Sequence, residues 1–451
     1  MRPRGRWLAA GAAVAVLIAI AVIWATSGTA RRTKPAVRAE QALAPEYVTN
    51  VSVRRVATPI RVTEVTTPDH GSWCWFGDPR AVSVGDARGE TFVGWIDWHG
   101  RITIGEYAGP RHTLRTHVLG KLAVDDHGSP SIQLEPDGRL TVFWSGHSGP
   151  AMNYRTSRRP FDIHSWGPTR RIADVLPGPT GFTYPNPEML SAENDTLYLF
   201  WRGGDWSADY ATRTRTGTWS AAHRLIAVPS ERPYVKVDSN GSNTIALAFT
   251  NGHPRGAVTS IYYAAIRDGA LWSAGGRLIA PLSRAPIAPR QADMVYDAQK
   301  TGVRAWVWDV AYDSGRPVIV YATFPSPQRH LYWYATWSGR RWISHRIAVG
   351  GPTISPHTIE KQYSAGLVLD HNDPSVVYMS RKVHGSFEIE RWTTSDGGAA
   401  WRYTTLARSS GADDVRPVVP RGQNGGPISL LWLHGHYHGY TGYRTSIAYL
   451  R

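Results

Sequence analysis

Residues 132–144 read Ile-Gln-Leu-Glu-Pro-Asp-Gly-Arg-Leu-Thr-Val-Phe-Trp. Two apolar stretches separated by a Pro-Asp-Gly-Arg turn predict two antiparallel strands, and the second ends in aromatic residues. Because the turn joins the strands at one end, the residues that flank this unit meet at the other end. His127 precedes the unit and His147 follows it, so the sequence predicts two imidazoles at one rim. Two unrelated surface histidines are the alternative that this local pattern leaves open.

The same arrangement recurs along the chain at intervals of about 50–70 residues. Several of the apolar strands are followed by a turn, a Trp and an Ile or Leu strand. The aromatic-ended strands lie at 92–95, 142–144, 199–201, 247–249, 318–321, 376–378 and 430–432. This period fits the four-stranded blades of a propeller, and the seven units predict an all-β, seven-bladed β-propeller. Two β-sandwich domains are the alternative, which the uniform repeat disfavours.

The ends of the repeat suggest how the ring closes. The last unit, from about Val415, offers three clear strands, whereas the Val, Thr and Ile alternation of 51–66 predicts a strand without a local partner. We therefore expect this N-terminal strand to complete the last blade and close the ring. Residues 394–401 resemble the Asp-box turn of sialidase-type propellers, in which the Asp caps a hairpin and the Trp packs between strands.

The N-terminus predicts export. Arg2, Arg4 and Arg6 precede residues 7–24, an uncharged and mostly apolar run. A signal peptide or an uncleaved signal anchor forming a transmembrane helix fits residues 1–30, and a buried core helix is the alternative. We expect 31–45 to be a linker and 46–451 to be the catalytic propeller. The protein would be membrane-anchored and face outside, or be secreted.

Composition narrows the partners. The formal net charge is +15, and for an exported protein this favours an anionic polysaccharide over nucleic acid. The one cysteine, Cys74, allows no intrachain disulfide and is interpreted as a small buried hydrophobe. We expect a monomer.

Further polar side chains belong to the same predicted rim. Tyr184 and Arg202 bracket a strand–turn–strand unit in the next blade, and Tyr234 and His253 bracket one in the blade after that. This rim has no paired carboxylate of the kind that a standard glycosidase needs. Arg can pair with a carboxylate and stabilise enolate charge, while Tyr or His transfers a proton. The set suits β-elimination at a uronate without a catalytic metal, unless each side chain merely packs at a strand end.

Several phrases resemble the BNR-repeat propeller family that includes the ulvan lyases and related rhamnosyl-glucuronate lyases and α-L-rhamnosidases. They are 73–80, 125–127, 145–147, 184–187, 200–203, 232–234, 363–366 and 370–374. The resemblance covers roughly residues 70–440. It implies a seven-bladed propeller that acts on sulfated or plant-type polysaccharides in which rhamnose is linked to glucuronate or iduronate.

The resemblance also implies roles for individual residues. His127 and His147 match two active-site histidines, and Tyr184 matches a tyrosine proposed as base and acid. Arg202, with a histidine, matches the group that neutralises the uronate carboxylate, and Tyr234 matches a tyrosine near the substrate. The expected catalytic residues are His127, His147, Tyr184 and Arg202, and the expected substrate-binding residues are Asn186, Arg232, Tyr234 and His253.

A second histidine cluster lies near the C-terminus. His434, His436 and His438 alternate along the chain, so on a strand their imidazoles would share a face and could hold a structural divalent metal. Gly435 and Gly439 favour a loop instead. No cofactor is expected to be required for catalysis.

The sequence as a whole predicts a polysaccharide lyase that cleaves a uronate-containing, rhamnose-bearing polymer. An α-L-rhamnosidase-type glycoside hydrolase on the same propeller and a non-catalytic glycan-binding propeller are the main alternatives. A sialidase would need an arginine triad and a Tyr–Glu pair, and only one good Asp-box is present. A propeller that serves as a scaffold for protein partners is also compatible with the pattern.

Overall fold

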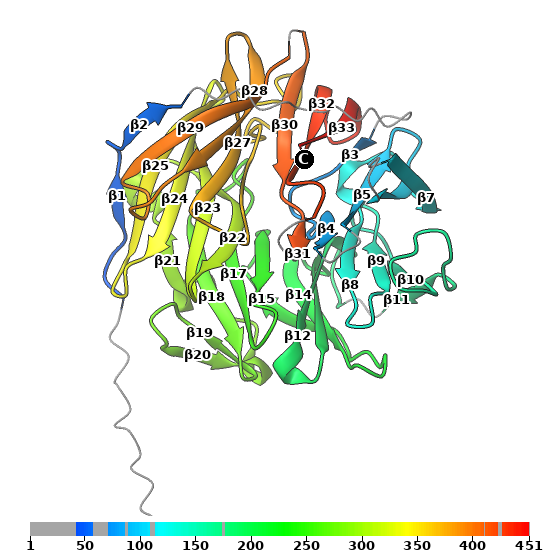
Figure 1. Cartoon of the computed structure of the whole chain (residues 1–451). Coiled ribbons are helices and arrows are strands. Elements are labelled where there is room, and N and C mark those ends of the chain that lie inside the picture. Colours follow the sequence, from blue (N-terminus) through cyan, green and yellow to red (C-terminus); the bar gives the residue numbers. More distant parts are fainter. Residues whose placement is uncertain are drawn as a thin grey trace, which may run out of the picture. The chain divides into compact units, whose positions relative to one another are not determined.

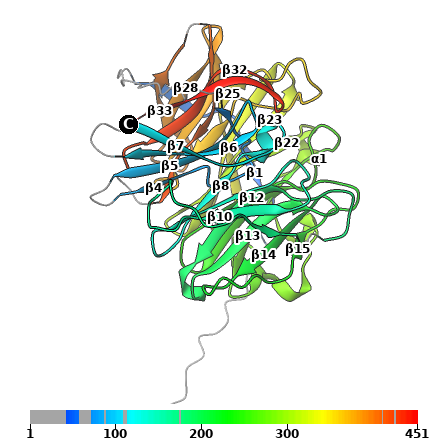
Figure 2. The same cartoon turned by 90° about the vertical axis from the view of Figure 1, so that its right-hand side faces the viewer.

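The computed structural model describes residues 42–56, 71–85, 89–108, 113–173, 176–409, 411–422 and 426–450. These residues form seven β-sheets and a few short helices. One strand of each sheet contacts one strand of the next sheet along the chain, as in blades arranged around an axis (Figures 1 and 2). The predicted all-β, seven-bladed propeller is therefore confirmed.

The first three sheets are built mainly from antiparallel neighbours in chain order. The first contains β4 (Ala81–Val84), β5 (Glu90–Asp97), β6 (Arg101–Ala108) and β7 (Thr113–Lys121), with β3 (Gly71–Ser72) on β5 and β31 (Arg421–Gly422) on β4. The second contains β8 (Ser131–Leu134), β9 (Leu140–Trp144), β10 (Met152–Thr156) and β11 (Arg170–Ile172). The third contains β12 (Thr183–Leu190), β13 (Thr196–Gly203), β14 (Ser207–Arg213) and β15 (His223–Ile226).

The remaining four sheets differ in their number of strands. The fourth contains β16 (Val235–Ser239), β17 (Thr244–Thr250), β18 (Ile261–Arg267), β19 (Ala270–Trp272), β20 (Leu278–Pro281) and β21 (Asp293–Tyr296). The fifth contains β22 (Ala305–Asp313), β23 (Arg316–Ser326), β24 (Arg329–Trp337), β25 (Trp342–Gly351) and β1 (Glu46–Val48). The sixth contains β26 (Leu367–Leu369), β27 (Val376–Val383), β28 (Ser386–Thr393), β29 (Ala400–Ala407) and β2 (Ser52–Arg55), and the seventh contains β30 (Asp413–Val418), β32 (Leu430–Gly439) and β33 (Gly442–Leu450).

The helices of the described residues are single turns. They are η1 (Asp126–Gly128), η2 (Ser191–Glu193), η3 (Leu282–Arg284), η4 (Pro289–Gln291) and α1 (Ala298–Thr301). Within the described part of the chain, no helix has the length and apolar character needed to cross a membrane. The predicted leader at 1–30 lies outside the described residues.

Two local predictions are confirmed. β8 and β9 are antiparallel, with Ile132 opposite Val142, which leaves both flanking histidines at the end opposite the turn. At the Asp-box, Asp396 accepts the backbone N–H of Ala400 at 2.9 Å, and the buried Trp401 indole donates to the Gly398 carbonyl at 2.9 Å. This turn therefore has a structural role in joining β28 to β29.

The predicted closure by an N-terminal strand is not confirmed. β2 pairs in parallel with β29 of the sixth sheet, because an outer strand offers a row of unpaired backbone groups, and residues 57–66 lie outside the described part. Among the residues that the structure describes, the seventh sheet has three strands. The first and last blades are instead joined by β31, which follows β30 and pairs in parallel with β4 (Figure 1).

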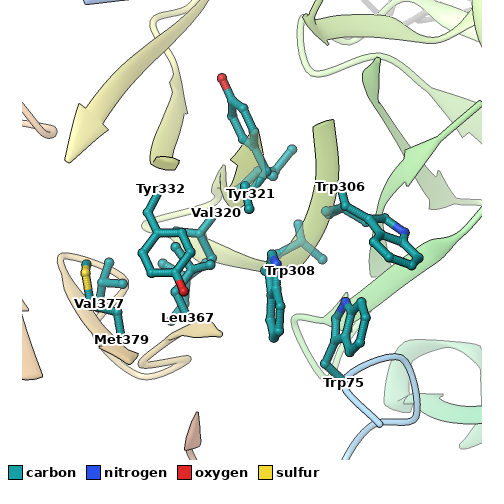
Figure 3. Packing of buried hydrophobic residues seen from close by; sticks show 14 of the residues in the cluster. Trp75, Trp306, Trp308, Val320, Tyr321, Tyr332, Leu367, Val377 and Met379 are labelled. Atoms are coloured by element: carbon teal, nitrogen blue, oxygen red, sulfur yellow. The ribbon is translucent and has the colours of Figure 1, made fainter. Parts of the chain in front are cut away.

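A buried segment ahead of the first blade lies among the inner strands. Trp73, Cys74, Trp75 and Phe76 are at most 1% exposed, which agrees with the interpretation of Cys74 as a small buried group. The Trp75 ring stacks on Trp308 at 4.6 Å between centroids and lies close to Trp306 (Figure 3). The segment thereby joins aromatic residues of several blades into one core.

Candidate active site

The structure brings the four expected catalytic residues together at one rim. His127 lies in η1 before β8, His147 follows β9, Tyr184 begins β12, and Arg202 lies near the end of β13. The two imidazoles stack with their centroids 4.0 Å apart and their planes 5° apart. The Tyr184 ring is 5.2 Å from that of His127, and the Arg202 guanidinium carbon lies 4.9 Å from the Tyr184 centroid. His147 is exposed, whereas the other three are buried.

Local backbone structure fixes the position of Tyr184. Tyr184 has a φ of 62°, an uncommon conformation for a tyrosine, at an irregularity in the pairing of β12 with β13. Asn186 donates to the Tyr184 carbonyl at 2.9 Å and accepts the backbone N–H of Asp78 at 3.1 Å. Asn186 was expected to bind substrate, but these bonds give its amide a structural task behind the tyrosine.

Arg202 is a buried cation that bonds to hydroxyl groups. Its guanidinium donates to the Tyr234 hydroxyl at 2.8 Å and to the Thr183 hydroxyl at 3.4 Å, and it lies over the Trp206 ring at 5.0 Å. Among the described residues, no carboxylate lies within 4.0 Å of it. The side chain is 4% exposed, so its charge is buried without a counter-ion. Such a charge favours the binding of an anion.

The other predicted binding residues lie beside Arg202. The buried His253 ring packs against that of Tyr234 at 5.4 Å, and its Nδ1 accepts the backbone N–H of Arg255 at 3.1 Å. Burial, together with Arg232 and Arg255, lowers the pKa of His253 to about 2, so this imidazole is neutral. The Arg232 guanidinium lies 4.9 Å from the centroid of the Trp206 ring. This side of the rim is therefore cationic.

Two rim residues were missed by sequence reasoning, although Asp125 belongs to a quoted phrase and Tyr440 closely follows a quoted histidine run. Asp125 accepts from Nδ1 of His127 at 2.6 Å and from Nδ1 of His147 at 3.1 Å. Its position two residues before His127 was a usable signal. The ring of Tyr440, from the seventh blade, meets both imidazoles edge-on, with centroids 4.9 and 5.9 Å away. Tyr440 closely follows the histidine run 434–438, whose alternating spacing predicted a metal site and gave no signal for the tyrosine.

Glu360 was also missed, and it corrects the expectation that carboxylates are lacking at this rim. It lies in the loop before β26, where no strand pattern marks it. One oxygen pairs with Arg255, and the other lies 3.4 Å from Nε2 of His253. Burial raises the pKa of Glu360, although Arg255 opposes this shift. The rim therefore holds two carboxyl groups, Asp125 and Glu360.

The surroundings give the rim groups different protonation states. Burial alone would lower the pKa of His127, but Asp125 and Asp126 outweigh it and raise that pKa. Burial and the neighbouring positive charges lower the pKa of His147 despite its bond to Asp125. Burial raises the pKa of Tyr184 well above its ordinary value, so its hydroxyl is protonated. The site therefore holds a proton donor and a neutral imidazole.

Metal binding by the rim histidines conflicts with their geometry. In the described part of the chain, possible ligand atoms of Asp125, His127 and His147 lie within 4.8 Å of one another. A metal–imidazole bond lies in the plane of the ring, and two parallel rings stacked 4.0 Å apart share no such point. A second group contains Cys74, Asp126 and His127, but Asp126 already binds the Arg416 guanidinium.

The C-terminal histidines lie away from this network. His434 lies 2.7 Å from the Asp414 carboxylate through Nδ1, while His436 and His438 are exposed with ring centroids 6.4 Å apart. Among the described residues, the three do not form a group with the spacing of metal ligands.

Comparisons with known proteins agree with this fold. Residues 90–349 match the BNR repeat-containing family, and the chain belongs to that family. An ulvan lyase from Pseudoalteromonas sp. (strain PLSV) is 29% identical over 100 residues, which are 19% of each chain. An ulvan lyase from Alteromonas sp. (strain LOR) is 26% identical over 123 residues, 23% of this chain and 24% of the relative. The chain thus spans about a fifth to a quarter of the length of these curated relatives.

Solved structures extend the likeness over most of the chain. An ulvan lyase of polysaccharide lyase family 25, bound to -[GlcA(1-4)Rha3S]-, superposes with a TM-score of 0.65 and 16% identity. That superposition covers 86% of this chain and 96% of the other. The polysaccharide lyase Uly1 gives a TM-score of 0.51 at 13% identity, over 91% of this chain and 97% of the other. At these identities the likeness establishes the fold.

Proposed function

We propose that the protein is a polysaccharide lyase that cleaves a uronate-containing, rhamnose-bearing polymer by β-elimination. The observation that carries this proposal is the buried Arg202 charge, which has no carboxylate partner among the described residues. A uronate carboxylate would supply the missing counter-ion through two charge-assisted hydrogen bonds. The same contact would stabilise the enolate-like charge that forms when the neighbouring carbon loses its proton.

The rim supplies groups for each proton transfer. The C5–H bond of the uronate breaks, its proton passes to a base, and its electrons form a C4–C5 double bond while the C4–O bond breaks. The leaving oxygen keeps the electron pair of that bond and takes a proton from an acid. Burial keeps Tyr184 protonated, which suits the acid, and His147 is the exposed neutral imidazole that suits the base. The resemblance implies that Tyr184 acts as both base and acid, and its protonated state favours the role of acid.

The curated relatives support this substrate class. Both are ulvan lyases, and one solved structure of similar fold carries a glucuronate–rhamnose sulfate oligosaccharide. The cationic side of the rim formed by Arg202 and Arg232 is compatible with such an anionic polymer. The basic, apolar N-terminus supports a location outside the cell, where such polymers are found.

One observation favours a second candidate, an α-L-rhamnosidase-type hydrolase. Asp125 and Glu360 lie at the same rim, and their environments shift their pKa values in opposite directions: burial raises that of Glu360, whereas the two histidines hold that of Asp125 well below its usual range. One protonated and one ionised carboxyl group are what an acid-catalysed hydrolysis uses.

The test is ultraviolet absorbance on a panel of glucuronate-containing polysaccharides. Elimination creates a conjugated unsaturated uronate that absorbs, whereas hydrolysis creates only reducing ends. We expect absorbance with the unchanged protein and its loss in Tyr184→Phe and His147→Ala. Tyr198→Phe is the matched control, because this hydroxyl bonds to Glu193 at the opposite end of the same blade. Reducing ends or free rhamnose without absorbance would replace the lyase with the hydrolase, and sugar binding without any product would leave a glycan-binding propeller.

A further inference from the structure

We propose that Asp125 is a positioning residue that keeps Nδ1 of both rim histidines protonated and allows the pair only one further proton. That proton lies on Nε2 of buried His127, so that His127 is charged and exposed His147 is neutral. This inference rests on the proposed function only for its catalytic consequence. The arrangement of the three side chains can be tested without any substrate.

The tautomer follows from hydrogen-bond chemistry. An ionised carboxylate only accepts hydrogen bonds, so each imidazole nitrogen that faces it carries a proton. Asp125 presents one oxygen to Nδ1 of His127 at 2.6 Å and the other to Nδ1 of His147 at 3.1 Å. The backbone N–H of His127 also donates to Asp125 at 2.9 Å, which ties the carboxylate to η1. Both rings therefore keep Nε2 as the atom that gains or loses a proton.

The sharing of one proton follows from the stacking. Two imidazolium charges on parallel rings 4.0 Å apart would repel each other. One carboxylate between them compensates only one such charge. The pair therefore favours one charged and one neutral ring over two charged rings.

The surroundings decide which ring holds the charge. Asp126 adds a second carboxylate oxygen 3.2 Å from Nδ1 of His127, while Arg202 acts on His147 as a nearby positive charge. The pKa of His127 is raised and that of His147 is lowered accordingly, each against a background of burial that lowers both. Several charged and titratable groups face the two rings. They are Cys74 ahead of the first blade, Asp125 before η1, Asp126 in η1, Tyr184 on β12, Arg202 on β13, Tyr440 after β32 and Arg416 on β30, with Glu360 and His253 at longer range.

As a catalytic consequence, the two histidines have different roles. His147 Nε2 keeps a free electron pair at neutral pH and can accept the C5 proton of a uronate. His127 carries the positive charge that favours binding of the anionic substrate. The carboxylate touches neither reacting atom and acts through the orientation and charge of the two rings.

The experiment is nitrogen-15 NMR of the full chain with labelled histidines, because imidazole nitrogen shifts report tautomer and charge. His127→Gln and His147→Gln assign the two signals. We expect His147 as the neutral Nδ1–H form and His127 as the charged ring at neutral pH. In Asp125→Asn the His127 pKa should fall by about one unit or more, and the His147 tautomer should change. Asp137→Asn, in the turn at the opposite end of this blade, is the control that should change neither.

Activity gives an independent readout. Asp125→Asn should lower kcat by roughly 10²- to 10⁴-fold with a smaller change in KM, and it should shift the pH profile. Asp125→Glu should recover part of the loss. Histidines that titrate independently, or that Asp125→Asn leaves unchanged, would overturn the inference even in an active lyase. The expected NMR pattern in a protein without lyase activity would instead support the inference and reject the proposed function.

Discussion

Arg202 and Arg416 are both buried arginines surrounded by aromatic rings, but within the described part of the chain only Arg416 pairs with a carboxylate. The guanidinium carbon of Arg202 lies 4.9, 5.0 and 5.3 Å from the rings of Tyr184, Trp206 and Tyr234, and that of Arg416 lies 5.1, 5.5 and 4.1 Å from the rings of Trp75, Tyr363 and Tyr437. Arg416 binds Asp126 at 2.5 Å and the Trp73 carbonyl at 2.6 Å. Arg202 has only hydroxyl partners among the described residues.

This difference separates a structural charge from a functional one. Arg416 is fully buried and joins the seventh blade to the segment ahead of the first blade and to the loop before β8. The carboxylate of Asp126 compensates its charge within the chain, although its Nε has no hydrogen-bond partner among the described residues. The charge of Arg202 at the rim is not compensated by a described carboxylate, so an anion from solution can pair with it. Aromatic enclosure alone therefore does not identify a binding arginine.

The largest expected effect is the loss of stability when Arg416, the arginine paired with Asp126, is replaced. Arg416→Met leaves Asp126 buried without its cation, so the free energy of unfolding should fall by about 3–5 kcal/mol. The urea midpoint and the thermal Tm measure this loss. A loss below about 1 kcal/mol would contradict the assignment of a structural charge.

Arg202→Met should show the opposite pattern. Removing an uncompensated buried charge should leave the free energy of unfolding unchanged or higher, while kcat/KM on a uronate polymer falls by about 10²- to 10³-fold. Arg213→Met is a matched control, because this arginine pairs with Glu135 outside the rim and should affect stability without affecting turnover. Clear destabilisation by Arg202→Met would show that its charge serves the fold.

A third prediction extends the comparison to another compensated cation. His371 lies 2.9 Å from Asp238 and 3.0 Å from Asp309. Although burial opposes the charge, these carboxylates raise the pKa of His371 to about 10, above the unfolded value of 6.5. Its contribution to stability is thus fully present below pH 6.5 and is lost as the pH rises towards 10, by up to about 1.4 kcal/mol per pH unit. His371→Gln should flatten urea midpoints measured across this range, and an unchanged slope would contradict the ion pairs.

The smallest expected effects come from a pair of tyrosines. Tyr234→Phe removes the hydroxyl that accepts from Arg202 and should lower kcat/KM about tenfold, with stability changed by less than about 1 kcal/mol. Tyr437→Phe removes the hydroxyl between Arg416 and Asp126 and should lower stability by about 1–2 kcal/mol with turnover nearly unchanged. Loss of stability in Tyr234→Phe together with loss of turnover in Tyr437→Phe would contradict the assignment of a functional role to Arg202 and a structural role to Arg416.

The repeated blade was readable from sequence because its signals are local. An apolar strand, a turn and an aromatic strand end are fixed by neighbouring residues, as β8 and β9 illustrate. The rim followed from the same logic, since His127 and His147 flank one hairpin. Strand pairing between distant segments has no such signal. β2 is a short, exposed strand that fits many outer edges, so its place on β29 could not be derived from its own residues.

The unpredicted site residues share a physical cause. Tyr440 and Glu360 come from loops of other blades, and only ring closure brings them to the histidines. Asp125 is adjacent in sequence, but its bonds to both imidazoles require the stacked geometry. The backbone bonds of Asn186 are likewise not revealed by any spacing rule, and its binding of substrate stays a prediction.

The strands β1 and β2, at residues 46–55, affect how the outer edges of two blades meet solvent. They cover the outer strands of the fifth and sixth blades, β25 and β29. A chain that begins after Val56 would keep every rim residue but would expose two bare strand edges, to which another copy could add a strand. Its solubility and tendency to self-associate would then change while its chemistry stayed intact. β1 and β2 thus replace the outer edges of two long strands with the edges of two short ones, which are poorer templates for pairing with another copy.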